Sequence, residues 1–341
     1  MKYSIGYQLP DEFDTTFDIC NDYADYISGV FFSWGNEPNG RSPLGTERER
    51  EEIEKIQLSE LKRIKFLGKK LTLLLNANCY GEYGASDKLK KHIIGLVDML
   101  KTEAGIDYVT TSSPFIADVL KEKYDDDIRI KASVNMKIGS VASMKQLSSS
   151  FDEFYIKKDI NRNFQEIEKL SNWCREHGKK LNILANSGCL TECAFQTFHD
   201  NLIAHQKIEY DDGLNIGYPA PCHKYLSSLD CFESMTQFMQ SNWIRPEEIY
   251  LYEKYFDEVK LATRMHSRPR MVIAAYCRGS FKGNLLDLTE PSYSKLFKGY
   301  VIDNTIVSKD WFNFASSCNK QCEDCNVCEN VLKSALVKYK I

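Results

Sequence analysis

The sequence predicts an α/β fold, a (β/α)8 barrel of the TIM type, and three observations support this prediction. Short β-branched or aromatic segments alternate with helical segments, as they do in parallel α/β folds. Eight such strand segments occur, which suits a closed barrel better than an open doubly wound sheet, the alternative fold. A chain of 341 residues, 43% of them hydrophobic and 27% charged, is also long enough to bury a core of this size.

The expected strands follow one another along the first 263 residues. They are YSIGYQ (3–8), SGVFFSW (28–34), KLTLLLN (70–76), IDYVTTS (106–112), RIKASVN (129–135), EFYIKK (153–158), KLNILAN (180–186) and DEVKLAT (257–263). Amphipathic segments at 48–67, 86–102 and 162–177 supply connecting helices. Polar residues follow most strands, and in a barrel the carboxyl ends of the strands surround the active site. We therefore expect a functional site at this end of the barrel.

The chain divides into a barrel with an insertion and a tail. About seventy residues separate the seventh and eighth strands, which is too long for a plain connection and indicates a functional insertion. We assign residues 1–300 to the barrel, with a cysteine-bearing insertion at about 187–244, and residues 301–341 to a cysteine-rich C-terminal tail. No internal repeat or low-complexity segment is visible.

Composition and charge indicate the cellular location and limit the classes of binding partner. The formal net charge of -4 gives no general basic surface, which disfavours a nucleic-acid partner but leaves a local basic patch open. The N-terminal segment lacks a secretory signal pattern, and no apolar run reaches the length of a membrane-spanning helix. We expect a cytoplasmic protein without a membrane partner. In that reducing compartment, clustered cysteines favour metal binding over disulfides.

The sharpest cysteine pattern lies in the tail. The segment CNKQCEDCNVC carries four cysteines whose spacing allows four thiolates to converge on one centre: Cys318, Cys322, Cys325 and Cys328. Four thiolates suit a tetrahedral zinc ion or an iron-sulfur cluster. The spacing predicts metal binding and leaves the metal open.

A second cysteine pattern follows the seventh strand. In NSGCLTEC, Cys189 and Cys193 stand four residues apart, so in a helix they would share one face. Cys222 in YPAPCHKY and either Cys231 or a tail cysteine would complete a four-thiolate cluster. A zinc site in which His199 and His205 join the pair is the alternative.

Several stretches resemble the collagenase-like peptidase family numbered U-thirty-two, in particular its short iron-sulfur relatives. The matching stretches, in the same order as in that family, are IRIKASVNMKIGS, FDEFYIKKDINRNFQEIEKL, LNILANSGCLTECAF, YPAPCHKY, SNWIRPEEIYLYEKYFDEVKLATR and the cysteine-rich tail. The resemblance covers about two thirds of the chain. It implies a (β/α)8 barrel that holds a 4Fe-4S cluster near the carboxyl ends of the strands.

The resemblance also implies site residues. Cys189, Cys193 and Cys222 fall where the family places cluster cysteines, and Cys231 substitutes for a fourth that is absent from SNWIRPEE. Lys260 and Arg264 in KLATR fall at the substrate end. Arg245, before Pro246, is a further candidate to clamp a carboxylate, and Asn242 is a candidate to line the pocket.

These observations lead to an expected function and two alternatives. We expect an iron-sulfur enzyme with a small-molecule substrate, carrying out a redox or oxygen-independent hydroxylation step, as the resemblance implies. The first alternative is an electron-transfer or assembly partner that uses the tail cysteines, with an electron-transfer protein as its partner. The second is a peptidase, which follows from the family name alone, because no Ser-His-Asp order and no HExxH motif is visible.

Overall fold

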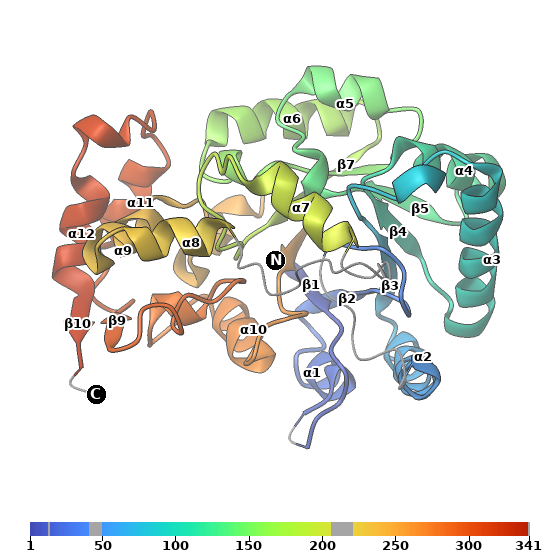
Figure 1. Cartoon of the computed structure of the whole chain (residues 1–341), viewed down its shortest axis with the longest axis horizontal. Helices are drawn as coiled ribbons and strands as arrows, with labels where there is room; N and C mark the ends of the chain where they lie inside the picture. Colours follow the sequence, from blue (N-terminus) through green and yellow to red (C-terminus); the bar gives the residue numbers. More distant parts are fainter. Residues whose placement is uncertain (13, 41–49, 206–220, 340–341) are drawn as a thin grey trace.

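Eight parallel strands close into a barrel in the computed structural model, which describes residues 1–12, 14–40, 50–205 and 221–339. The strands are β1 (Lys2–Gly6), β2 (Ile27–Phe32), β3 (Lys70–Leu75), β4 (Tyr108–Thr111), β5 (Arg129–Ala132), β6 (Glu153–Tyr155), β7 (Lys180–Leu184) and β8 (Glu258–Leu261). They pair in sequence order, and β8 pairs with β1 to close the barrel (Figure 1). The predicted TIM-type fold is confirmed, and each observed strand lies within or overlaps its predicted segment.

Helices connect the strands around the outside of the barrel (Figure 1). They are α1 (Thr16–Asp22), α2 (Arg50–Phe66), α3 (Asp87–Ala104), α4 (Pro114–Tyr124), α5 (Val141–Leu147), α6 (Phe164–Glu176) and, after β8, α10 (Pro269–Arg278). Helix α3 shows why they begin and end where they do. The Ser86 side chain accepts a hydrogen bond from the Leu89 amide at its start, and Gly105, with φ of 70°, ends it in the left-handed conformation.

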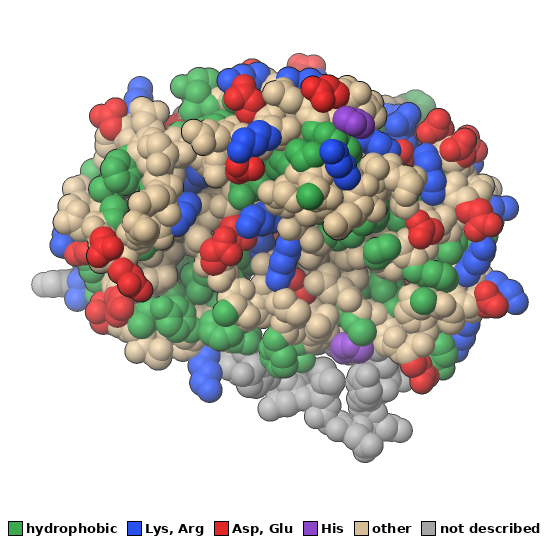
Figure 2. Space-filling view, turned by 90° about the horizontal axis from the view of Figure 1, so that it is seen from above, with side chains coloured by type: hydrophobic (Ala, Val, Ile, Leu, Met, Phe, Trp, Pro, Cys, Tyr) green, Lys and Arg blue, Asp and Glu red, His purple; other side chains and the backbone are tan. Residues whose placement is uncertain are grey.

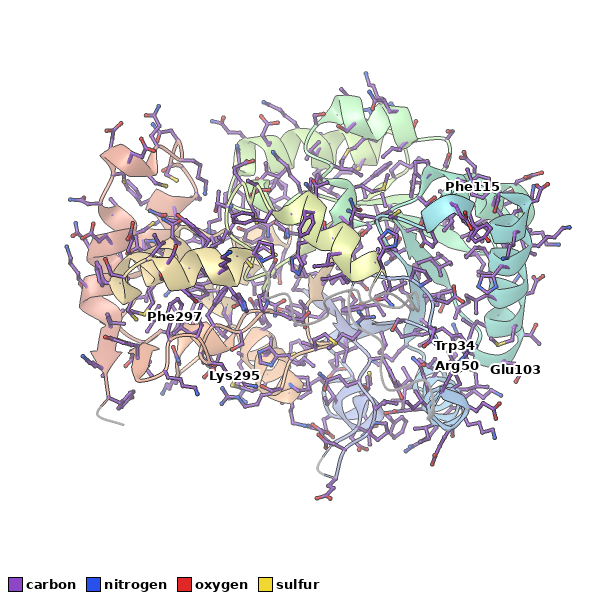
Figure 3. The ribbon with its side chains drawn as sticks, viewed as in Figure 1. Trp34, Arg50, Glu103, Phe115, Lys295 and Phe297 are labelled. Carbon is purple, nitrogen blue, oxygen red and sulfur yellow. The ribbon has the colours of Figure 1, made fainter. Side chains whose placement is uncertain are left out.

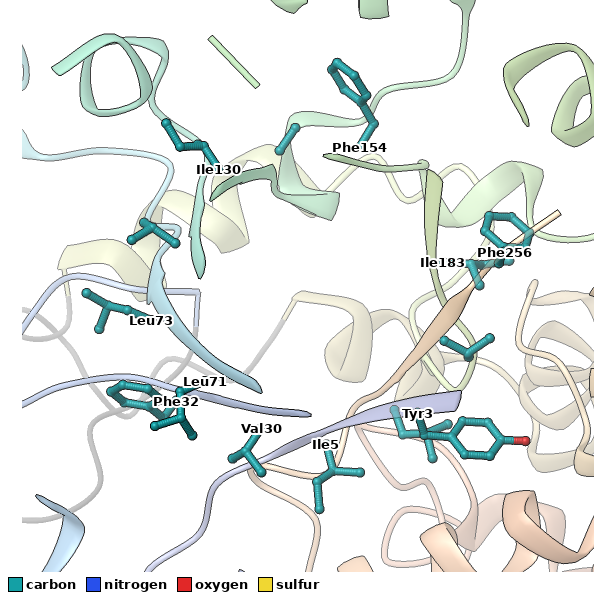
Figure 4. Close-up of a cluster of buried hydrophobic side chains, with 14 of the residues drawn as sticks. Tyr3, Ile5, Val30, Phe32, Leu71, Leu73, Ile130, Phe154, Ile183 and Phe256 are labelled. Atoms are coloured by element: carbon teal, nitrogen blue, oxygen red, sulfur yellow. The ribbon is translucent and has the colours of Figure 1, made fainter. Parts of the chain in front are cut away.

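Apolar side chains and one ion cluster form the inner part of the fold. Figure 4 shows a buried cluster to which Tyr3, Phe32, Leu71 and Phe154 contribute. Lys131 on β5 forms ion pairs with Glu153 on β6, at 3.1 Å, and with Glu258 on β8, at 3.4 Å. Because β5 and β8 are not neighbours in the barrel, the second pair crosses its interior. This part of the barrel is therefore filled.

A second hydrophobic cluster joins the insertion to the C-terminal part of the chain. Its elements are α8 (Pro221–Ser228), α9 (Cys231–Gln240), η6 (Leu285–Asp287), β9 (Tyr300–Ile302), α11 (Lys309–Ala315), α12 (Val327–Ala335) and β10 (Leu336–Lys338). Helix α9 packs on α12, and β9 pairs with β10 in an antiparallel sheet. These elements lie together beside the barrel (Figure 1), and in Figure 3 Lys295 and Phe297 mark the segment between η6 and β9. Insertion and tail, which the sequence analysis treated separately, thus pack as one unit.

The surface shows no extended area of one charge on the face drawn in Figure 2. Acidic and basic side chains are interspersed there, outside the grey residues. This face therefore lacks the basic stripe that follows a phosphate backbone. Among the described helices, none combines the length and the apolar composition that crossing a membrane requires.

Candidate functional site

A pocket of about 400 Å³ lies at the carboxyl ends of strands β5 to β8. Its walls come from the loops after these strands, from α7 (Gln196–His205), from the start of α8 and from residues 290–295. The polar and sulfur-bearing side chains that line it are Asn135, Lys158, Ser187, Cys189, Cys193, Gln196, His199, Asp200, Cys222, His223, His266, Ser267, Glu290, Ser292, Ser294 and Lys295. This is the end of the barrel at which the sequence analysis expects the functional site.

Asn186 fixes the chain where β7 ends and the pocket begins. Its amide nitrogen donates to the carbonyls of Ala262, at 2.9 Å, and Leu288, at 3.1 Å, and its amide oxygen accepts from the Ala262 N–H at 2.6 Å. The side chain is fully buried, so these bonds do not compete with water. Asn186 therefore ties the end of β7 to the end of β8 and to the C-terminal part of the chain.

Gly188 lets the loop after β7 pass close to the segment at 289–293. The Gly188 N–H donates to the Glu290 carbonyl at 3.1 Å, and the Tyr293 hydroxyl donates to the Gly188 carbonyl at 2.7 Å. A Cβ atom at Gly188 would lie 2.6 Å from the Pro291 carbonyl oxygen, closer than van der Waals contact permits. Glycine at this position thus allows the backbone contact that places Cys189 at the pocket.

Two further contacts hold the rest of this loop. The Thr191 hydroxyl donates to the Gln240 carbonyl at 2.9 Å and accepts from the Asn242 amide at 3.0 Å. The Glu192 N–H donates to the Asp159 carboxylate at 2.7 Å. The loop between Cys189 and Cys193 is therefore anchored both to the insertion and to the connection after β6.

Three thiols, Cys189, Cys193 and Cys222, meet at this pocket. Cys222 is the second residue of α8 and reaches the pocket from the insertion, whereas the other two come from the loop after β7. Burial and then the neighbouring thiols of Cys189 and Cys193 raise the pKa of Cys222 to about 11. Burial also raises the pKa of Cys193. In the metal-free protein, Cys193 and Cys222 are therefore predominantly neutral thiols at pH 7.

Thiolates are soft ligands, and three of them suit a metal centre with one open position. Within the described ranges, no three His, Cys, Asp or Glu side chains are already spaced as metal ligands. The kinds of side chain at the pocket therefore suit a metal, although their present spacing is not that of a metal site.

The fourth predicted cluster ligand, Cys231, lies elsewhere. It is the first residue of α9, beside Tyr300 and Lys338, and it does not line the pocket. Asp230 begins α9 as its N-cap and separates this helix from α8, so Cys222 and Cys231 occupy different helices despite their short separation in sequence. The structure brings three of the four predicted cluster cysteines together and leaves Cys231 outside.

The pocket histidines differ in what they are able to do. Both ring nitrogens of His266 are engaged: Nε2 contacts the Asp287 carbonyl at 2.7 Å, and Nδ1 accepts from the Arg268 N–H at 3.0 Å. His223 is half-buried, and burial lowers its pKa, so its imidazole is neutral at pH 7 and able to accept a proton. His199 lines the pocket, but His205, its partner in the zinc alternative, does not.

Two of the predicted catalytic residues lie away from the pocket: Lys260 is half-buried and Arg264 is buried. The Lys260 ammonium sits 3.8 Å from the centre of the Phe31 ring, in a cation–π contact. Arg264 is buried, and its guanidinium donates to the Asn39 side chain at 2.8 Å. Neither lines the pocket, although the two residues that follow Arg264 do.

The other two, Arg245 and Asn242, connect parts of the fold. The buried Arg245 pairs with Glu248 through two 3.0 Å contacts from Nε and donates to the Val307 carbonyl at 3.2 Å. Asn242 is also buried; besides its bond to Thr191, it accepts a hydrogen bond from the Lys320 ammonium at 2.7 Å. Neither residue lines the pocket.

Several pocket residues escaped the sequence analysis. Glu290 and Tyr293 come from the irregular region after α10, where no strand or helix pattern indicates their position. His223 directly follows Cys222, and Lys158 belongs to the polar residues after β6, so both carried a signal that was not used.

Comparisons with known proteins give a sequence relative and a clear structural neighbour. No family model matches the chain. It is 28% identical over 275 residues to the uncharacterized protease MJ1657 of Methanocaldococcus jannaschii, covering 78% of this chain and 77% of that protein. Among solved structures, the U32 peptidase Mk0906 superposes with a TM-score of 0.55 and 17% identity, covering 77% of this chain and 92% of that one.

These names contradict the expected iron-sulfur enzyme with a redox or hydroxylation step. One relative is named a protease and the other a peptidase, which matches our second alternative better. The sequence has no Ser-His-Asp order and no HExxH motif, but these two motifs do not cover all peptidase mechanisms, so their absence does not exclude a peptidase. The chain is thus similar in sequence to a named protease over most of its length, and it shares its fold with a U32 peptidase.

Proposed function

We propose that this chain is a peptidase whose substrate binds in the pocket at the carboxyl ends of β5 to β8. One observation carries the proposal: the loop after β7 and the insertion bring three thiols and the neutral His223 to a cavity at the end of the barrel where barrel enzymes place their active sites. The names of the sequence relative and of the structural neighbour give the reaction class.

The walls of the pocket suit a short peptide segment. A volume of about 400 Å³ falls within the range of small-ligand sites. Leu184, Leu190 and Ile203 provide apolar surface for a side chain, whereas Lys158 and Lys295 offer cations to a carboxylate or a carbonyl of the substrate. The mixture of both kinds of wall favours a substrate with apolar side chains along a polar backbone.

Cys189, Cys193 and Cys222 are the residues that would hold a metal ion such as zinc, and an ion bound there with an open position would polarise a carbonyl oxygen of the substrate. His223, neutral at pH 7, accepts a proton from the attacking water and returns it to the leaving amine. Glu290, whose carboxylate accepts from the Met265 N–H at 3.1 Å, shapes the opposite wall.

The test is cleavage of a mixed peptide library by protein purified anaerobically, with products identified by mass spectrometry. We expect cleavage by the wild type, a loss of about 10²–10⁴-fold in kcat/KM for His223→Gln, and a loss at least as large for Cys222→Ser. Cys231→Ser is the matched control, because that thiol lies outside the pocket, and it should retain wild-type activity. Failure of the metal-loaded wild type to cleave any peptide, or undiminished cleavage by Cys222→Ser, would contradict the proposal.

A further inference from the structure

The tail carries a second group of thiols, away from the pocket. Cys318 follows α11, Cys322 begins the short helix η7 (Cys322–Asp324), and Cys328 lies in the first turn of α12. The thiol of Cys328 is within electrostatic range of Cys318 and Cys322, and Cys322 is within range of Cys325. All four thiols belong to one short segment and none of them lines the pocket, although among the described residues no three of them are already spaced as metal ligands.

The backbone between the first two of these cysteines turns sharply. Lys320 adopts a positive φ of 64°, a conformation that non-glycine residues rarely take outside special turns. Cys318 and Cys322, on either side of this turn, are within electrostatic range of each other. It also directs the Lys320 ammonium inward, where it donates to the buried Asn242 side chain at 2.7 Å.

A buried guanidinium faces the same thiols without a carboxylate partner. Arg162, from the connection between β6 and α6, is 2% exposed, and its centre lies 4.6 Å from the Trp311 ring. Its hydrogen bonds go to backbone carbonyls, such as that of Trp243 at 3.0 Å from Nε. In the described part of the chain no salt bridge reaches Arg162, and the nearby Glu248 is already paired with Arg245.

Negative charge on the thiols would stabilise the two neighbouring cations, Arg162 and Lys320. Buried charges in proteins are normally paired, because an isolated ion loses its hydration without compensation. The groups within electrostatic range of Arg162 include Cys318 and Cys328, and those of Lys320 include Cys318, Cys322 and Cys328. Thiolates at these positions would supply the charge that the two cations lack.

One buried donor points to the same conclusion. The buried Trp311 indole N–H lies beside the Cys328 sulfur and makes no other hydrogen bond to the described residues. A metal-bound thiolate sulfur would be a better acceptor for this donor than a neutral thiol. This group, like Arg162, is placed for a thiolate and not for a neutral thiol.

We propose that Cys318, Cys322, Cys325 and Cys328 form a second metal centre, separate from the pocket, in which four thiolates bind zinc or an iron-sulfur cluster and Arg162 and Lys320 balance their charge. On binding, each thiol releases its proton to solvent. Four thiolates around a dication, whether zinc or an oxidised 4Fe-4S core, leave two negative charges, which match the two cations. Because Arg162 belongs to the barrel, the centre also fastens the tail to it.

The test separates this centre from the pocket by using a variant that lacks the pocket thiols, Cys189→Ser/Cys193→Ser/Cys222→Ser. The protein is expressed and purified anaerobically, and its metal content is measured by native mass spectrometry, which distinguishes zinc from an iron-sulfur cluster. We expect one metal centre per chain in this background. Adding Cys325→Ser and Cys328→Ser should remove it, whereas adding Cys231→Ser and Cys277→Ser should not.

A folded pocket variant, verified by circular dichroism, that binds no metal would overturn the proposal. That outcome is independent of the proposed function, since the pocket thiols are absent from the experiment. Wild-type protein provides a second measurement that does not depend on a variant folding. Although Cys322 and Cys325 are exposed, their alkylation should be slow until a chelator is added; fast alkylation without a chelator would contradict metal binding.

The charge balance has its own test. Lys320→Gln removes the cation but keeps a donor for Asn242, and we expect it to weaken metal binding about tenfold, in the range of other changes next to metal ligands. Lys320→Arg should bind metal as the wild type does. Competition with a chelator measures both affinities, and equal affinities of the Gln variant and the wild type would show that Lys320 does not balance the charge.

Discussion

The two groups of thiols differ in their surroundings, and we propose that they form two different kinds of metal site. The pocket thiols line an open cavity together with His223 and Glu290. Of the tail thiols, Cys318 and Cys328 lie near the buried Arg162 guanidinium and Cys328 also lies beside the Trp311 indole N–H, whereas Cys322 and Cys325 are exposed. Catalytic metal sites keep an open position, whereas structural ones are closed by four protein ligands. We therefore propose that the pocket thiols serve catalysis and that the tail thiols hold the tail to the barrel.

A chain of hydrogen bonds connects the two places. The Lys320 ammonium donates to Asn242, Asn242 donates to Thr191, and Thr191 lies in the loop between Cys189 and Cys193. The bonded atoms are 2.7 Å and 3.0 Å apart, respectively. The tail thus contacts the pocket loop through Asn242, and three substitutions test how far the two places depend on each other.

The largest effect is expected at Arg162. Arg162→Met removes the buried cation while keeping an unbranched side chain, and we expect the free energy of unfolding to fall by about 3–5 kcal/mol, the cost of breaking a buried charge pair. In a background that lacks Cys325 and Cys328, the same substitution should cost clearly less, because the metal that would keep Cys318 as a thiolate can no longer bind. Denaturant titration of both backgrounds, each with and without Arg162→Met, measures this difference in unfolding free energy. An equal loss in both backgrounds would show that Arg162 does not interact with the tail thiols.

Gly188→Ala should act on the pocket alone. The added Cβ would lie 2.6 Å from the Pro291 carbonyl, so the loop must shift, at a cost of about 1–3 kcal/mol. We expect peptide cleavage and metal at the pocket to decrease, while metal at the tail is retained. Gly178→Ala is a control for glycine replacement, since nothing lies within 4 Å of its Cβ position, although its φ of 63° makes the backbone costly for alanine too. Loss of tail metal in the Gly188 variant would show that the two sites are not separate.

The smallest effect on the two proposed metal sites is expected at Asn242. Asn242→Leu removes both hydrogen bonds at similar volume and leaves the Lys320 ammonium without this acceptor, so stability should fall by about 1–3 kcal/mol. The metal of each site should remain, but the loop of Cys189 and Cys193 should exchange its amide protons faster. Hydrogen exchange read by mass spectrometry measures this. Unchanged amide exchange in that loop would show that the tail does not stabilise the pocket loop through Asn242.

The sequence predicted the barrel well because each strand carries its own local pattern. All eight segments, from YSIGYQ to DEVKLAT, form strands of the closed barrel. The tail cysteines were visible for the same reason, since they lie within one short segment. A feature formed by residues that are close in the sequence can therefore be predicted from their spacing.

Contacts between distant segments were harder to predict. Lys260 and Arg264 stand at a strand end in the sequence, but only the fold shows that one lies over Phe31 and the other beside Asn39. Arg245 pairs within its own turn and reaches Val307, a contact that no spacing indicates. Likewise, the charge of Arg162 becomes informative only once the tail is folded against it.

The most direct test of the account is an anomalous difference map from crystals of anaerobically purified protein. The account predicts two separate peaks, one in the pocket beside Cys189, Cys193 and Cys222, and one beside the tail cysteines near Arg162. A single peak shared by both groups of thiols, or ordered thiols without any peak, would contradict it.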